Sequence, residues 1–202
     1  MSAAAAVHAA GRIGPNAIIR MAEALRQRVG EAETARLFGE AGLERYLGAM
    51  PEHMVAEAEV ATLQRVVRGA LAAEDARYVA RDAGLRTGDY LLAHRIPRFA
   101  QHILRALPPA LSSRMLLAAI RRNSWTFAGS GVFEAHAGHP VRVAIRGCPV
   151  CRDIAANEVA CDYYAATFER LFRELVNGKT TVVETACEAT GADACEFEIR
   201  WR

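Results

Sequence analysis

The chain has 202 residues, of which 52% are hydrophobic and 24% are charged, and its formal net charge is +2. These values are ordinary for a soluble globular protein. A charge so close to zero implies no strong attraction to polyanions, and no basic run with interleaved aromatic residues indicates nucleic-acid binding. No run of about 18 apolar residues occurs, so no membrane-spanning helix is expected.

The N-terminal stretch "MSAAAAVHAAGRIGP" is small and apolar, but it lacks the basic start and the leucine-rich centre of a secretory signal. The expected location is therefore the cytoplasm, where thiols stay reduced. The chain has five cysteines, and all of them come after residue 147. An odd number of clustered cysteines in a reducing compartment favours a metal site over disulfides.

Residues 1–122 are predicted to be mainly helical. Pro15 stands at a first-turn position, and a second short helix is expected over about 31–41, with Gly42 as its stop. After a break at Pro51, apolar residues continue at helical spacing, with further breaks expected near Gly69 and Gly84.

Two more helices complete this part. One is expected to start at Pro97, and "LPPA" separates it from the other, which is predicted over 111–121. The chain is treated as a single domain, 1–202, in which the helical part precedes a second part, 123–202, that combines strands, one helix and a hairpin.

The pattern changes after residue 122. Aromatic and β-branched residues with glycine punctuation predict two or three antiparallel strands between Trp125 and Arg146. "CPVC" is predicted to be a turn, and a long helix is expected over about 154–177, with a stop at Gly178. Two closing strands are predicted over 180–187 and 195–201. The predicted fold class is α+β: N-terminal helices packed on a small antiparallel sheet, with a long helix inserted before the final hairpin.

The final hairpin brings two thiols together. Cys187 ends one strand and Cys195 begins the next, while Glu184 lies three residues before Cys187. A bulge or twist would let Glu184 and Cys187 point to the same side. Zinc in a structural site takes four tetrahedral ligands, usually thiolate or imidazole and sometimes carboxylate. The hairpin supplies up to three of them, so at least one ligand must come from elsewhere.

The residues leave two sources for the missing ligands. Cys161 lies near the start of the long helix, where the helix dipole favours a thiolate. Cys148 and Cys151 of "CPVC" have the spacing of a zinc knuckle and would complete a site of four thiolates. Two further interpretations stay open: separate buried cysteines with no ligand, and a redox dithiol in "CPVC".

A resemblance adds to these patterns. The segment from "YYAATFERLF" through the glycine stop to "ET-x-C … G-x-x-x-C-x-F" resembles the vinyl-reductase-type small-molecule-binding domain. That domain occurs in bacteriochlorophyll biosynthesis proteins, in archaeal proteins and in the sensor modules of phenol-responsive regulators. The whole chain resembles the bacteriochlorophyll members, which carry the name 4-vinyl reductase, although its N-terminal part matches more in length and helical character than in motif.

The resemblance implies a set of metal ligands. In the phenol-sensing relatives, zinc is held by a cysteine at the start of the long helix and by Glu, Cys and Cys of the final hairpin. By position, these ligands would be Cys161, Glu184, Cys187 and Cys195. The zinc would be structural, closed to substrate and holding the hairpin to the helix. "CPVC" departs from the family pattern, which keeps Cys148 and Cys151 open as replacements for Cys161 and Glu184.

The family fold also implies an apolar cavity between the helices and the sheet. A tetrapyrrole such as a magnesium porphyrin would need flat apolar walls, cationic groups for its propionates and an axial ligand for magnesium. The candidate ligand-binding residues are Trp125, Phe127, Phe133, Tyr164, Phe168, His94, Arg98 and His102. Tyr163 is a further candidate for the wall, and Arg95, Arg105, Arg121 and Arg122 are further candidate cations.

Several functions follow from the resemblance. The preferred one is an accessory protein of bacteriochlorophyll biosynthesis that binds a magnesium-tetrapyrrole intermediate and hands it to the magnesium chelatase or methyltransferase. No G-x-G-x-x-G between strand and helix and no ferredoxin-like cysteine run supplies a reductant site. The alternatives are a 4-vinyl (8-vinyl) reductase, if the chain is an enzyme, and a ligand-sensing module acting through a partner. A homodimer and a location peripheral to the photosynthetic membrane are also expected.

Overall fold

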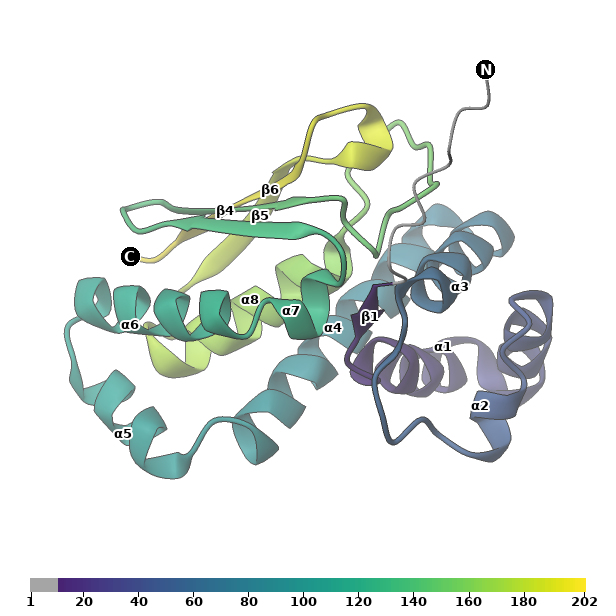
Figure 1. The fold of residues 1–202 in the computed structure, drawn as a ribbon, viewed down its shortest axis with the longest axis horizontal. Coiled ribbons are helices and arrows are strands. Elements are labelled where there is room, and N and C mark those ends of the chain that lie inside the picture. Colours follow the sequence, from purple (N-terminus) through teal and green to yellow (C-terminus); the bar gives the residue numbers. More distant parts are fainter. Residues whose placement is uncertain (1–10) are drawn as a thin grey trace, which may run out of the picture.

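The computed structural model describes residues 11–202 and shows an α+β fold (Figure 1). The helices are α1 (Asn16–Glu40), α2 (Arg45–Gly48), α3 (Glu57–Ala70), α4 (Ala73–His94), α5 (Arg98–Ala106), α6 (Pro109–Arg122), α7 (Trp125–Ala128) and α8 (Asp162–Leu175). The strands are β1 (Arg12–Ile13), β2 (Val55–Ala56), β3 (Val132–His136), β4 (Val141–Arg146), β5 (Thr181–Ala186) and β6 (Cys195–Arg200). Residues 1–10, which make up most of the stretch predicted not to be a secretory signal, lie outside this range.

The main sheet has four antiparallel strands in the order β3-β4-β6-β5, and β1 and β2 form a separate small pair. Buried and exposed residues alternate along β4 and β6, so one face of the sheet is apolar and the other is charged. Helix α8 lies across the apolar face with α6 beside it (Figure 1). The predicted closing strands and the inserted helix are confirmed.

Helix α4 crosses directly beneath α8 (Figure 1). A Cβ on Gly84 would lie 2.2 Å from the carbonyl oxygen of Tyr163, and a Cβ on Gly88 would lie 2.7 Å from the side chain of Arg170. The predicted helix break near Gly84 is wrong. Helix α4 continues through this glycine because the missing side chain lets two backbones approach, and not because the chain turns there.

Other predicted breaks are confirmed. Helix α1 is interrupted at Gly30, where φ is 83°, so its second part corresponds to the short helix expected over 31–41. Gly42 follows with φ 69°, a conformation that favours glycine. Helix α3 ends one residue after Gly69, and α5 begins directly after Pro97.

Two predicted elements differ from the structure. The strands expected from Trp125 onward begin only at Val132, because residues 125–128 form a helical turn in which the N–H of Phe127 donates to the carbonyl of Ser124. The helix expected from about residue 154 begins at Asp162. The preceding segment is not helical because it is held to the hairpin loop, where the N–H of Ala156 donates to the carbonyl of Ala189 at 2.8 Å.

Among the described residues, none of the helices combines the length and the apolar character needed to cross a membrane. The longest, α1, is cut by Gly30 and carries charged residues along its length.

Candidate functional site: a buried cysteine cluster beside an apolar cavity

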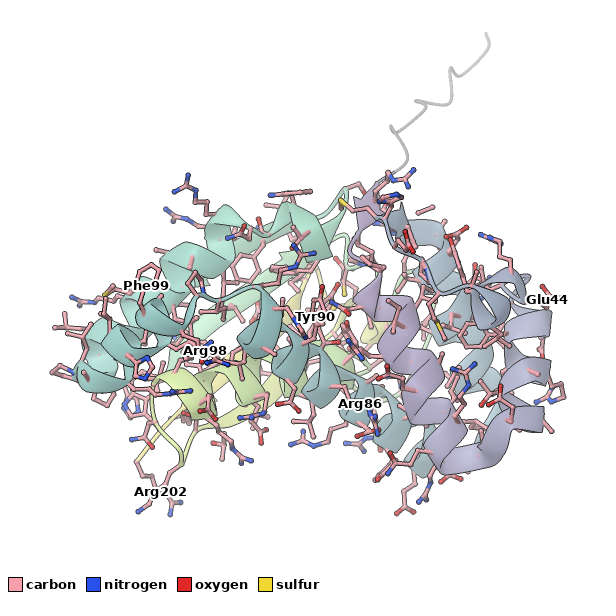
Figure 2. The ribbon with its side chains drawn as sticks, turned by 90° about the horizontal axis from the view of Figure 1, so that it is seen from below. Glu44, Arg86, Tyr90, Arg98, Phe99 and Arg202 are labelled. Atoms are coloured by element: carbon pink, nitrogen blue, oxygen red, sulfur yellow. The ribbon has the colours of Figure 1, made fainter. Side chains whose placement is uncertain are left out.

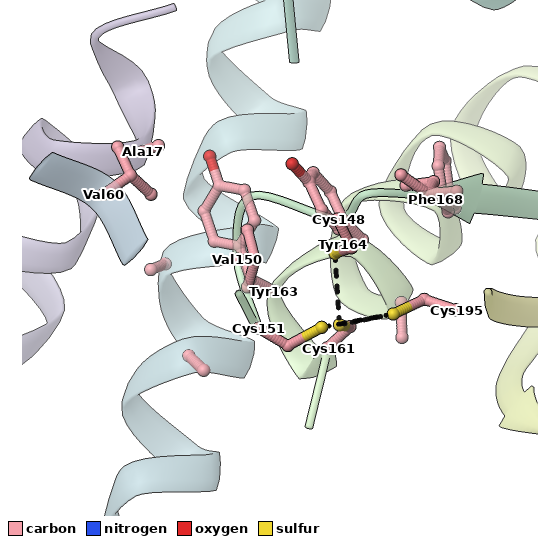
Figure 3. Packing of buried hydrophobic residues seen from close by; sticks show 14 of the residues in the cluster. Ala17, Val60, Cys148, Val150, Cys151, Cys161, Tyr163, Tyr164, Phe168 and Cys195 are labelled. Carbon is pink, nitrogen blue, oxygen red and sulfur yellow. Dashed lines mark hydrogen bonds between the residues drawn. The ribbon is translucent and has the colours of Figure 1, made fainter. Parts of the chain in front are cut away.

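All five cysteines are buried, form no disulfide and gather in one place. Cys148 and Cys151 come from the turn after β4, and Cys161 is the residue that caps the N-terminus of α8. Cys187 follows β5, and Cys195 is the first residue of β6. Figure 3 shows the turn, the helix start and the hairpin converging at this point.

The sulfur atoms are spaced as a tetrahedral site requires. The Sγ of Cys161 lies 3.5 Å from that of Cys148, 3.4 Å from that of Cys195 and 3.9 Å from that of Cys187. The remaining close pairs are Cys151 with Cys195 at 3.3 Å and Cys187 with Cys195 at 3.8 Å. Zinc–sulfur bonds of about 2.3 Å place two tetrahedral ligands about 3.8 Å apart. The cluster therefore has the size of a metal site.

Glu184 supplies a carboxylate to the same cluster. Strand β5 has a register irregularity between Glu184 and Ala186, as the sequence predicts, and it turns the carboxylate toward Cys161. The Oε2 atom accepts a hydrogen bond of 2.7 Å from the backbone N–H of Cys161. The Oε1 atom is buried and has no hydrogen-bond partner among the described residues. Burial, with the nearby Cys187 thiolate, raises the pKa of Glu184 to about 9.

Two sets of four ligand atoms lie within bonding range of one ion. One set is Cys148, Cys151, Cys161 and Cys195, and the other is Cys161, Glu184, Cys187 and Cys195. In each set the ligand atoms lie within 4.8 Å of one another. The structure thus brings together both sets that the sequence left open, and they share Cys161 and Cys195.

The donors fit a thiophilic divalent ion such as zinc. Thiolates and a carboxylate are the ligands that zinc takes in closed sites, and the unpartnered Oε1 of Glu184 is an oxygen that only a proton or a cation would satisfy. Each set offers four ligand atoms, which fills a tetrahedral ion and leaves no open position. An ion held here is structural: it stabilises the hairpin against α8 and activates no substrate.

The thiols share protons with one another. The pKa of Cys151 is lowered because neighbouring thiols, first of all that of Cys148, hydrogen-bond to its thiolate. The pKa values of Cys161 and Cys195 are correspondingly raised, since each is held as a donor among these sulfurs. A group of thiols that stabilises a thiolate in this way is prepared for metal binding, because the thiolate is the metal ligand.

Backbone contacts hold the three segments in place. The carboxylate of Glu188 accepts hydrogen bonds from the N–H groups of Gly147 and Cys148, at 2.6 Å and 2.8 Å, and so fastens the "CPVC" turn to the hairpin loop. Arg68 of α3 donates to the carbonyl of Ala160, directly before the helix cap. Neither Glu188 nor Arg68 was expected from the sequence, because no local motif marks a contact between residues so far apart.

A cavity of about 530 Å³ lies between α1, α4, α6, α7 and the N-terminal half of α8. Its volume is within the range of roughly 300–1,000 Å³ that is usual for small-molecule pockets. Most of its wall is apolar or aromatic, and the polar groups on it include Thr87, Tyr90, Arg95 and Asn123. Tyr163 and Tyr164 follow Cys161 by two and three residues and line the cavity, so α8 joins the cysteine cluster to the cavity wall (Figure 3).

Both tyrosines are fixed by hydrogen bonds. The hydroxyl of Tyr163 pairs with that of Thr87 at 2.8 Å, and the hydroxyl of Tyr164 donates to the carbonyl of Phe127 at 2.7 Å. Burial raises the pKa of Tyr163 to about 12, although the hydrogen bond with Thr87 acts in the opposite direction. Both rings therefore stay neutral and present rigid walls to the cavity.

The expected ligand-binding residues are distributed between wall, core and surface. Trp125, Phe127 and Tyr164 line the cavity. Phe133 and Phe168 do not line it, because they pack with Phe127 and Phe197 and fill the space between α8 and the sheet. The cavity therefore lies among helices and not, as the family fold implied, against the four-stranded sheet.

The three cationic candidates of the sequence analysis lie at the surface. His94, Arg98 and His102 are exposed and do not line the cavity. Among the neighbouring arginines, Arg95 does line it, and its guanidinium lies 5.9 Å from the ring centre of Tyr90. Tyr90 lies near the centre of the molecule in Figure 2. It was not among the expected residues, although its helical spacing from Thr87 would have placed both on one face of α4.

A thiolate and carboxylate cluster between a helix and a hairpin, joined to an apolar cavity, defines a protein of the vinyl-reductase domain class. The family model of this 4-vinyl reductase domain matches residues 141–201, which run from β4 to the end of β6 and include all five cysteines. Two relatives extend the match to nearly the whole chain, and both are named bacteriochlorophyll synthase 23 kDa chain.

The relative from Cereibacter sphaeroides is 44% identical over 94% of this chain and 91% of its own length. The relative from Rhodobacter capsulatus is 40% identical over 93% of this chain and 86% of its own length. The chain therefore belongs to the family of bacteriochlorophyll biosynthesis proteins that carry the 4-vinyl reductase domain.

Proposed function

We propose that this protein binds a magnesium-tetrapyrrole intermediate of bacteriochlorophyll synthesis and hands it to an enzyme of the pathway. The observation that carries the proposal is the cavity of about 530 Å³ with aromatic walls, in a chain whose relatives are named for bacteriochlorophyll synthesis. Apolar walls with a few placed polar groups are typical of small-molecule sites.

The cavity wall suits a flat pigment. Trp125, Phe127 and Tyr164 offer aromatic surface to the macrocycle, while Arg95 offers a cation to a propionate. Phe133 and Phe168 support this wall from the core. The tilted stack of Tyr90 and His94, with ring centres 4.9 Å apart, adds a histidine beside the wall. Of the other two cationic candidates, Arg98 would reach only a propionate that projects from the cavity, and His102 bonds the carbonyl of Arg98 through Nδ1.

Binding and turnover can be measured in one mixture. Purified protein is mixed with a divinyl magnesium porphyrin and NADPH, and absorbance, fluorescence and products are followed. We expect a shifted porphyrin band and no ethyl product. Ethyl product without added partners would instead support the alternative, a vinyl reductase, and an unshifted band would contradict pigment binding.

A pair of arginine variants tests the position of the pigment. R95Q removes a cation that lines the cavity, and we expect it to weaken porphyrin binding about tenfold, as the loss of one charged hydrogen bond does. R98Q is the matched control, since Arg98 is exposed on the next helix and does not line the cavity. Equal effects of both substitutions would place the pigment elsewhere.

We infer that zinc is the metal of the cluster and that Cys161, Glu184, Cys187 and Cys195 hold it. The unpartnered Oε1 of Glu184 favours this set, because the ion would satisfy a buried oxygen that is otherwise without a partner among the described residues. The same set follows from the family resemblance by position. Zinc in this place would be a structural ion and would not take part in a reaction.

The handover requires a partner. We propose that the magnesium chelatase or the methyltransferase of the pathway receives the pigment, and that the protein acts as a homodimer. The relatives are named as a chain of bacteriochlorophyll synthase, which supports association with a pathway enzyme. Co-purification with each enzyme, with and without porphyrin, tests the choice. Porphyrin-dependent capture of neither enzyme would contradict the handover.

We also propose that the protein works at the surface of an anionic membrane. Residues 90–133 contain six arginines and no aspartate or glutamate, whereas the rest of the chain contains 19 basic and 23 acidic residues. Six of the eight large apolar side chains that are exposed in the described residues also fall in this segment: Phe99, Ile103, Leu111, Met115, Trp125 and Val132. Exposed apolar side chains among arginines are typical of interfacial helices.

Arg98 and Phe99 lie together at the α5 end of the molecule, opposite Glu44 (Figure 2). Flotation with vesicles tests this face: we expect binding to phosphatidylglycerol vesicles that weakens with salt, and little binding to phosphatidylcholine. The variant F99S/I103S should lose binding, while V183S, at an exposed valine on β5, should keep it. Equal binding to both lipids, or no loss in F99S/I103S, would contradict the proposal.

A further inference from the structure

We propose that the cysteine cluster holds two divalent metal ions at once, bridged by the thiolates of Cys161 and Cys195. One ion would take Cys148 and Cys151 as its other ligands, and the second would take Glu184 and Cys187. This inference extends the metal centre proposed above, because it adds a second ion on the "CPVC" turn and makes two ligands common to both ions.

The geometry points to bridging because the two four-ligand sets share two sulfurs. The shared atoms, Sγ of Cys161 and Sγ of Cys195, lie 3.4 Å apart. Two ions that each lie about 2.3 Å from both sulfurs, on opposite sides of the pair, would be about 3 Å apart. Thiolate sulfur has more than one lone pair and can bind two ions, so the short sulfur–sulfur distance is the edge common to two tetrahedra.

Each ion would also have its own pair of terminal ligands on its own segment. Cys148 lies 3.5 Å from Cys161, and Cys151 lies 3.3 Å from Cys195, so the turn supplies one sulfur beside each bridging atom. On the other side, Cys187 lies 3.9 Å from Cys161 and 3.8 Å from Cys195, and Glu184 completes that set. The turn and the hairpin therefore serve different ions.

Two ions satisfy the whole cluster. One ion in either set would leave two ligands of the other set buried without metal, including the unpartnered Oε1 of Glu184 when the ion lies on the turn side. Five thiolates and one carboxylate carry six negative charges, of which two divalent ions neutralise four. The N-terminus of α8, which begins directly after Cys161, stabilises part of the remainder.

An iron–sulfur cluster fits these distances less well. Inorganic sulfide and several iron atoms must lie between the cysteine sulfurs of such a cluster, which holds those sulfurs apart. Here the sulfurs lie 3.3–3.9 Å from one another, which is the separation of ligands on a common ion. The cluster therefore favours zinc or a similar thiophilic divalent ion.

Metal content per chain is the first test. Elemental analysis of the purified full chain, after dialysis against zinc, should give two ions in the wild type. C148A/C151A should retain one ion, E184Q/C187A should retain one ion, and C161A should retain none. T185S is the control, because Thr185 is exposed on the same strand as Glu184 and should leave two ions in place.

The outcomes separate this inference from the simpler metal centre. One ion in the wild type, or an unchanged content in C148A/C151A, would overturn the pair of ions while leaving a single structural zinc. No ion in the wild type would remove both proposals. Circular dichroism on each variant identifies chains that lost metal only because they did not fold, and the two terminal double variants should stay folded because each keeps one complete tetrahedral set.

Cadmium-113 substitution provides the second test. Two ions that share thiolates should give two cadmium resonances that are split by coupling through the bridging sulfurs. Resonances without mutual coupling, or a single resonance at full loading, would exclude the bridged pair. In C148A/C151A, one resonance should remain and its splitting should disappear.

Discussion

Glu57 is a buried carboxylate that ties three distant segments together. It begins α3, accepts hydrogen bonds from the N–H and the hydroxyl of Ser130 at 2.8 Å and 2.6 Å, and pairs with Arg152 in the turn that carries Cys151. Gly129 makes room for it: its φ is +60°, and a Cβ there would lie 2.1 Å from the carboxylate. Glu57 therefore supports the "CPVC" turn from the side away from the hairpin.

Replacing this carboxylate should destabilise the protein at neutral pH but not at low pH. Burial alone would raise the pKa of Glu57, but the bonds from Ser130 and the pairing with Arg152 outweigh it, and the net pKa lies below 4.5. A lowered pKa stabilises the fold above about pH 4.5, and this stabilisation is lost as the pH falls through the folded-state pKa. We expect E57Q to lower the free energy of unfolding by about 2 kcal/mol at pH 7.

Denaturant unfolding at pH 7 and pH 3 measures the effect. The difference between E57Q and wild type should shrink at pH 3, where the wild-type carboxylate also gains a proton. E52Q is the control, because Glu52 is an exposed glutamate outside any element. A loss of stability in E57Q that is the same at both pH values would show that the side chain acts through packing and not through its charge.

At the scale of elements, the contact between α4 and α8 positions both the metal centre and the cavity. Helix α8 presents Cys161 to the cluster at its start, and Tyr163 and Tyr164 to the cavity within the next turn. Gly84 lets the backbone of α4 approach the carbonyl of Tyr163. The hydroxyl of Tyr163 therefore reaches Thr87 only when the two helices lie this close.

A side chain at Gly84 should force the helices apart. Its Cβ would lie 2.2 Å from a backbone oxygen that has no rotamer to change, so we expect G84A to lower the free energy of unfolding by about 3 kcal/mol. G69A is the matched control in α3, where a Cβ would meet nothing within 4 Å, and it should leave stability unchanged or raise it by about 0.5 kcal/mol. Thermal unfolding measures both. Equal stability of the two variants would contradict the close helix contact.

At the scale of the whole molecule, the cysteine cluster joins parts of the chain that the sheet alone leaves separate. The turn after β4, the start of α8 and the final hairpin meet there, and backbone bonds through Glu188 and Arg68 reinforce the meeting. The metal would bind only this folded arrangement, so its binding free energy becomes folding free energy.

Removal of metal should therefore lower the melting temperature of the entire chain and not only of the hairpin. We expect a loss of at least about 3 kcal/mol, which corresponds to a fall of about 10 °C for a chain of this length. Calorimetry before and after treatment with a strong chelator measures the fall, and added zinc should reverse it. A purified chain that carries no metal and melts at the same temperature with chelator would contradict the proposed centre.

The order of elements could be predicted from local patterns alone. Apolar residues at helical spacing, Pro15, Pro97 and the glycines at 42 and 69 indicated most helices, and alternation indicated β4, β5 and β6. These features depend on neighbours in the chain, as backbone preferences and hydrophobic periodicity do. The bulge at Glu184 was also predicted, because a carboxylate three residues before a thiol reaches the same side of a strand only through such an irregularity.

The tertiary structure alone decided which features act together. It showed that Gly84 serves a helix crossing, that Phe133 and Phe168 fill the core, and that Arg95 lines the cavity while Arg98 faces outward. It also brought Cys148 and Cys151 into the same cluster as Cys161. The physical reason is common to all of these features: each is a contact between segments far apart in the chain, whose distance is set by packing and leaves no trace in local sequence.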